Sequence, residues 1–90
     1  MPALLIRHQV SDFEHWINVF EEEAETRRAN GLQAEQLYRS ASDPSEVWIL
    51  ATWDDLFRAR LFVKSDEHAE ALMRGGVSEF PDHWYLDDAD

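Results

Sequence analysis

The sequence predicts an α+β domain in which two helices cover one face of a four-stranded antiparallel sheet. A run of β-branched and aromatic residues, Val47 to Trp53, is typical of a buried strand. At Asp54 this run changes directly to helical spacing, with Leu56, Ala59 and Phe62 on one stripe. The remaining segments complete the order β-α-β-β-α-β, which a split pair of β-α-β units produces.

The first strand is expected over residues 3–10, where side chains alternate between two faces. Leu4, Ile6, His8 and Val10 share one face, and Leu5 lies on the other with more polar neighbours. The first set is the more apolar, so we expect it to face the helices.

The first helix is expected over residues 13–30. Ser11 and Asp12 precede it and offer N-caps for the free N–H groups of its first turn. Charged residues, Arg27 among them, are expected mostly outside its apolar stripe. Asn30-Gly31 is a plausible end, since glycine adopts the left-handed conformation without penalty. The stripe consists of Phe13, Trp16, Ile17, Phe20 and Ala24.

A second strand is expected over residues 32–40, and a turn containing Asp43-Pro44 joins it to the strand over 47–53. The second helix begins after Asp54-Asp55, with Asp54 as a good N-cap. Two alternatives remain for its course: it continues to Arg74, or it breaks near Ser65-Asp66, where a fresh cap occurs.

The last extended segment is expected over residues 77–86, after Gly75-Gly76 ends the helix. Pro81 keeps the first half of this segment out of central pairing, because proline cannot donate to the sheet.

The predicted order gives a ferredoxin-like fold, a single domain over residues 1–90. Both helices lie on one side of the sheet in this fold, so its other face is bare. Leu5, Tyr38 and Trp48 are too apolar for water if they lie there. We therefore expect a homodimer in which these residues form the interface.

Composition limits the partners. The chain has 44% hydrophobic and 12% aromatic residues, which argues against disorder, and a formal charge of −11. A field of that sign repels phosphate backbones and anionic lipid, so nucleic-acid and membrane partners are not expected. The absence of cysteine excludes disulfides and thiolate metal sites. No apolar run is long enough for a signal peptide or a membrane span, so a cytoplasmic location is expected.

His8 is the first candidate for chemistry. It lies on the apolar face of the first strand, where a half-dry pocket would let it act as a general base or hold a substrate oxygen. The alternative is a histidine at the edge of the core, satisfied by a backbone or water partner.

Other candidates for the ligand pocket are Trp16, Trp53, Tyr85 and His83. Trp16 and Trp53 can stack on a flat ligand and Tyr85 can donate to a ligand oxygen, and each also falls where burial in the core or an interface would place it. His83 can enter either the pocket or the dimer interface. His15 and His68 are expected at the surface. The four histidines match no His-x-x-x-His pattern, so no dedicated metal site is expected.

The chain resembles the dimeric α/β-barrel superfamily, which includes antibiotic-biosynthesis-monooxygenase-like proteins and short proteins called cyclases. The resemblance covers nearly the whole chain. It rests on Arg7–Trp16, Tyr38-Arg39, Ser42–Val47, Trp53–Leu56, Ala59-Arg60, Phe62 and Met73–Val77.

The resemblance implies that two sheets pack face to face and that each protomer keeps a pocket between its sheet and helices. Some such proteins oxidise or cyclise aromatic polyketides without metal or flavin, and others degrade haem. Phe62 and Leu72 occupy the positions of the haem-branch Trp and His, which argues against haem degradation. We expect no cofactor and an apolar or aromatic ligand. The activity implied is a cofactor-independent polyketide-type cyclase or oxygenase; the alternative is a non-catalytic binding or accessory protein.

Overall fold

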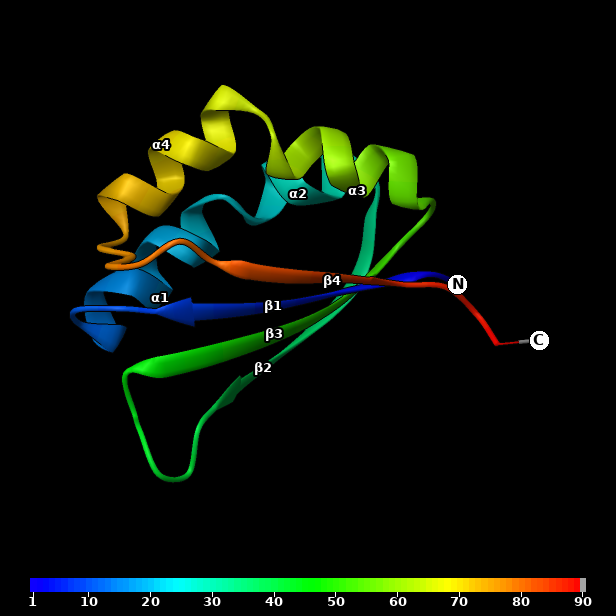
Figure 1. Ribbon diagram of the computed structural model, residues 1–90. Coiled ribbons are helices and arrows are strands. Elements are labelled where there is room, and N and C mark those ends of the chain that lie inside the picture. Colours follow the sequence, from blue (N-terminus) through cyan, green and yellow to red (C-terminus); the bar gives the residue numbers. More distant parts are fainter. Residues whose placement is uncertain (90) are drawn as a thin grey trace.

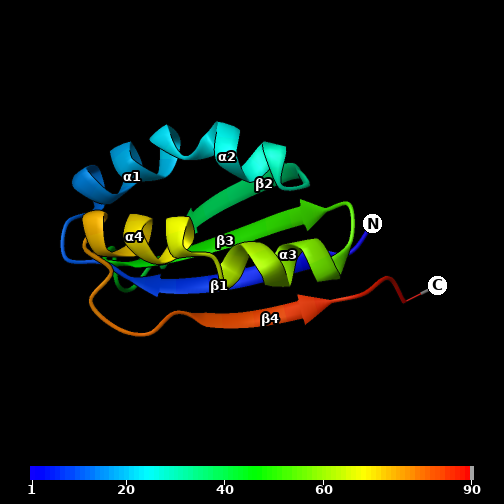
Figure 2. The same cartoon turned by 90° about the horizontal axis from the view of Figure 1, so that it is seen from above.

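The computed structural model describes residues 1–89 and has the predicted α+β architecture. The four strands form one antiparallel sheet in the order β2-β3-β1-β4, and all helices lie on one side of it (Figures 1 and 2). This is the ferredoxin-like arrangement. The elements are β1 Ala3–Gln9, α1 Phe13–Glu22, α2 Ala24–Ala29, β2 Leu32–Arg39, β3 Glu46–Trp53, α3 Leu56–Val63, α4 Asp66–Arg74 and β4 Asp82–Leu86.

Each predicted helix is divided into two. The single helix expected over residues 13–30 ends at Glu22 and restarts at Ala24, and the intervening Glu23 pairs with Arg74 of α4. Of the two alternatives for the second helix, the break is confirmed. The Ser65 hydroxyl accepts a hydrogen bond from the His68 N–H and so caps α4.

Aspartates cap α1 and α3, as the sequence predicts, but the cap of α3 is one residue later than expected. Asp12 caps α1 by accepting from the His15 N–H. Asp55, rather than Asp54, caps α3. Asp54 instead accepts from the Asp55 N–H and pairs with Arg58. Its carboxylate also lies against Gly31, where φ is +118° and a Cβ would collide with it. Glycine suits this turn for two reasons: it adopts the positive φ without strain, and its missing side chain leaves room for the Asp54 carboxylate.

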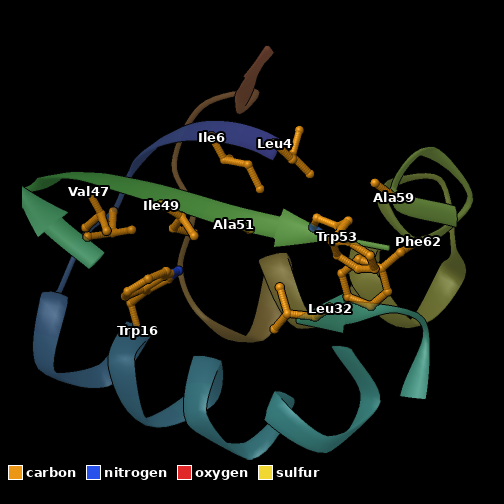
Figure 3. Close-up of a cluster of buried hydrophobic side chains, with 11 residues drawn as sticks. Leu4, Ile6, Trp16, Leu32, Val47, Ile49, Ala51, Trp53, Ala59 and Phe62 are labelled. Carbon is orange, nitrogen blue, oxygen red and sulfur yellow. The ribbon is translucent and has the colours of Figure 1, made fainter. Parts of the chain in front are cut away.

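The helix-facing side of the sheet forms the core. Alternate residues of β1 and β3 point to the helices, as the side-chain period of two requires. Trp16 from α1 and Phe62 from α3 pack over them, and Leu32 of β2 lies next to Trp53 in the sheet (Figure 3). The buried strand residues are Leu4, Ile6, His8, Val47, Ile49, Ala51 and Trp53.

The opposite face of the sheet carries large apolar side chains. Cross-strand register places Leu5 opposite Trp84 and Tyr38 opposite Trp48. The Trp48 and Trp84 rings stack with centroids 5.8 Å apart. Tyr38 is 54% exposed and Trp84 42% exposed, so this patch faces outward in a single chain. All helices lie on the other side, as Figure 1 shows.

Within residues 1–89, no helix has both the length and the apolar character needed to cross a membrane.

Candidate functional site

A cavity of about 50 Å³ lies between the helices and the sheet. That volume holds a few water molecules or part of a small ligand. All four helices and three of the strands contribute to the lining. The lining side chains are mostly apolar, and the polar ones are His8, Glu23, Arg27, Glu35 and His68.

Two aromatic rows border the cavity. In one, Trp16 stacks on Phe20 with ring centroids 4.9 Å apart and lies 5.9 Å from His8. In the other, Phe62 lies 5.5 Å from Trp53 and 4.9 Å from His68. The Trp16 and Phe20 rings are stacked, with 24° between their planes, and the other three pairs are tilted by 39° to 55°, so the lining of the cavity is largely aromatic.

His8 is buried at one wall of the cavity and is only 2% exposed. Burial lowers the pKa of His8 to about 3, with smaller contributions from His68 and His83. Its imidazole is therefore neutral at physiological pH. Its Nδ1 atom is buried and has no hydrogen-bond partner among the described residues. A neutral imidazole of low pKa is a weak base but a good hydrogen-bonding group for an oxygen atom.

His68 was expected at the surface, and that prediction is wrong. It lies in the first turn of α4, is half-buried, and lines the cavity. Burial lowers the pKa of His68 to about 4, with further contributions from His83 and Arg27. The break at Ser65 explains the difference, because it starts a new helix on which His68 lines the cavity while Asp66 and Glu67 stay exposed.

Arg27 was expected outside the apolar stripe, yet it is 7% exposed. Its Nε and one terminal nitrogen donate to both Glu35 oxygens at 3.1 and 2.9 Å, and the other terminal nitrogen donates to the Phe20 carbonyl. The guanidinium also lies 3.6 Å from the Phe20 ring centroid. One feature of the sequence could have predicted the contact between Arg27 and Phe20: the two residues are seven apart, which is about two helical turns.

The structure brings together three of the predicted site residues and leaves two apart. His8, Trp16 and Trp53 line the cavity, whereas Tyr85 and His83 do not. Both lie on β4, an edge strand whose helix-facing side lies beside the cavity. There the Arg60 guanidinium covers the Tyr85 ring, 4.6 Å from its centroid. Burial lowers the pKa of His83, although Asp82 opposes the shift.

The remaining predicted positions are also placed. His15 is exposed, as expected, and its Nε2 lies 2.6 Å from the Arg74 carbonyl oxygen. Phe62 and Leu72 line the cavity with apolar side chains. Among residues 1–89 no three metal-ligating side chains come together in a metal-binding group.

Solved structures share this fold at low identity. SnoaB, a cofactor-independent oxygenase from Streptomyces nogalater, is 14% identical with a TM-score of 0.79, covering 99% of this chain and 93% of that one. An antibiotic biosynthesis monooxygenase is 13% identical with a TM-score of 0.76, covering 100% of both chains. A conserved protein from Methanosarcina mazei Go1 is 16% identical with a TM-score of 0.73, covering 94% of this chain and 89% of that one.

A search of curated proteins finds no match to the chain. The model of one protein family does match. That family is described as antibiotic biosynthesis monooxygenase, and the match covers residues 5–74, from β1 to the end of α4. These residues include every side chain that lines the cavity except Leu4. The chain therefore belongs to the antibiotic biosynthesis monooxygenase family.

Proposed function

We propose that the protein is a cofactor-independent oxygenase that acts on a small, electron-rich aromatic metabolite of the polyketide type. Family membership supports oxygenase chemistry, and the similar fold of a cofactor-independent oxygenase supports a reaction without flavin or metal. The observation that carries the proposal is the cavity itself. It combines two aromatic rows with a buried, neutral His8.

Such a reaction balances with dioxygen as the only co-reactant. A ring carbon that bears two hydrogens becomes a carbonyl and gives up four electrons. One oxygen atom of O₂ enters the carbonyl, and the other leaves as water with both hydrogens. The substrate supplies the electrons, so the tasks of the protein are to bind and orient the substrate and to exclude water.

His8 is assigned the role of holding a substrate oxygen. Its low pKa disfavours a resting role as general base, since an efficient base has a pKa near the working pH. A neutral imidazole still forms a directional hydrogen bond with a ring hydroxyl. Trp16 and Trp53 provide the surfaces on which the ring stacks.

Oxygen consumption with 1,8-dihydroxyanthrone as substrate tests the proposal, with His8→Ala compared against the surface variant His15→Ala. We expect turnover by the unmodified protein and by His15→Ala. Loss of an orienting hydrogen bond should slow His8→Ala about 10- to 100-fold. A loss of about 10²–10⁴-fold would instead indicate proton transfer by His8. Full activity in a stably folded His8→Ala protein would remove His8 from the site.

A ligand-binding protein without turnover is the second candidate. The cavity volume of about 50 Å³ and the low pKa of His8 both favour it, because neither suits a large substrate or a strong base. Binding of a single-ring phenol such as p-cresol, seen as quenching of tryptophan fluorescence, with no oxygen consumption in the anthrone assay would support this candidate over the oxygenase.

We also propose that the protein is a homodimer in which the open sheet face is covered by a second copy. Leu5, Tyr38 and Trp48 lie on that face with Trp84, around the Arg7–Asp82 ion pair. Exposed clusters of large apolar side chains rimmed by polar groups commonly mark protein–protein interfaces. Sedimentation at micromolar concentration should give the dimer mass, and a monomer mass would contradict the proposal.

A further inference from the structure

Three polar atoms on side chains that line the cavity have no hydrogen-bond partner among the described residues, and a fourth such atom, His83 Nε2, belongs to a side chain outside the lining. The three at the lining are His8 Nδ1, His68 Nε2 and Trp53 Nε1, and each is buried. All three side chains line the same cavity, although they come from β1, α4 and β3. A buried polar atom without a partner is costly, so a group of three around one cavity indicates a polar occupant.

The chemistry of the three atoms defines the occupant. The Trp53 Nε1–H can only donate, so the occupant must carry an acceptor oxygen. A neutral imidazole nitrogen donates in one tautomer and accepts in the other, so His8 and His68 can serve either a hydroxyl or a carbonyl. Burial keeps both imidazoles uncharged near neutral pH.

The charged groups of the cavity exclude an anionic occupant. Arg27 is the lining cation within residues 1–89, and both oxygens of Glu35 already bind it. Glu23 adds a carboxylate, which is paired with Arg74. No free positive charge remains at the lining to balance a ligand carboxylate, and the net charge of −11 adds repulsion.

We propose that His8, His68 and Trp53 form a three-point polar site that binds an uncharged hydroxyl- or carbonyl-bearing aromatic and rejects its carboxylate analogue. The inference rests on the proposed function and adds a substrate class to it. His68 is the new member of the site. The centroid of the His68 ring lies 4.9 Å from that of the Phe62 ring, so packing against the core holds the His68 ring in place.

The test uses three single-ring probes of similar shape: p-cresol, p-xylene and 4-methylbenzoate. Affinities are measured by calorimetric titration at pH 7, and the ring nitrogens of the histidines are followed by ¹⁵N NMR. We expect p-cresol to bind and to shift His8 and His68 while leaving His15 unchanged. The carboxylate should bind at least about 100-fold more weakly, because burying an unpaired carboxylate costs several kcal/mol.

His68→Phe keeps the ring that packs on Phe62 and removes the nitrogen atoms. We expect it to weaken p-cresol roughly 3- to 10-fold and to leave p-xylene unchanged, since one neutral hydrogen bond is lost. His68→Gln should recover part of the loss, and His15→Gln should bind like the unmodified protein. A melting curve for each variant checks that it is folded.

Equal affinity for p-cresol and 4-methylbenzoate would overturn the inference. An unchanged p-cresol affinity in folded His68→Phe would do the same, and either result leaves the proposed oxygenase activity standing. Binding that depends on His68 without any anthrone-dependent oxygen consumption would support the site and contradict the oxygenase. Failure of p-cresol to bind at millimolar concentration would overturn the three-point site.

Discussion

Acidification from pH 7 to pH 5.5 should destabilise this protein through its buried histidines. Burial lowers the pKa of His8 to about 3 and that of His68 to about 4, against an ordinary value of 6.5 in the unfolded chain. Below pH 6.5 the unfolded chain takes up protons that the folded protein does not. Stability is therefore fully present above the unfolded pKa and is lost as the pH falls toward the folded values.

The magnitude follows from these values. At pH 5.5 protonation stabilises the unfolded chain by about 1.4 kcal/mol per histidine, against about 0.2 kcal/mol at pH 7. His8 and His68 together therefore cost the folded state about 2.5 kcal/mol over this range. His83 acts in the same direction, since burial lowers its pKa too. Ordinary carboxylates with a pKa near 4 remain mostly ionised at pH 5.5, so the histidines dominate the change.

Urea unfolding at fixed protein concentration, at pH 7 and pH 5.5, measures the effect. For a domain of this size the loss corresponds to a fall in melting temperature of roughly 10–20 °C. The double variant His8→Leu/His68→Phe should show a much smaller pH dependence, whereas His15→Gln should keep the full one. An unfolding free energy that does not change between the two pH values would refute the reasoning, as would an equal fall in the double variant.

Three further predictions follow from the remaining features. Trp48→Glu should convert the proposed dimer to monomer in sedimentation, because it buries an unpaired charge, while Met73→Glu on the exposed side of α4 should not. Arg27→Met should lower the unfolding free energy by about 3–5 kcal/mol, since it leaves Glu35 unpaired at the cavity, and adding Glu35→Gln should restore much of it; equal stability of the single and double variants would contradict this. Purified protein should show no Soret band, no flavin spectrum and no stoichiometric metal by elemental analysis, and any one of these would contradict the expectation.

Local patterns predicted most of the fold. Period-two alternation in β1 correctly assigned Leu4, Ile6 and His8 to the core face, and the apolar run from Val47 to Trp53 correctly predicted a strand. Asp12 and the two glycine-containing helix ends were also predicted, because caps act within one turn of the chain. The break at Glu23 was not predicted, and Glu23 pairs there with Arg74, a residue far away in sequence.

The candidate site was predicted only in part. His8, Trp16 and Trp53 line the cavity, and the roles assigned to them there stay a prediction. His68 was assigned to the surface because its sequence neighbours are acidic, which describes the other side of its helix.

The sequence by itself determined the order of strands and helices and the family, since these depend on periodicity, caps and a pattern spread along the chain. Tertiary structure alone decided which polar groups share the cavity. Arg27 lies with Glu35, and His68 with His8, only because two separate helices pack over one sheet. Burial then removes the charge of the two histidines, and desolvation of this kind depends on the whole surrounding fold rather than on neighbours in sequence.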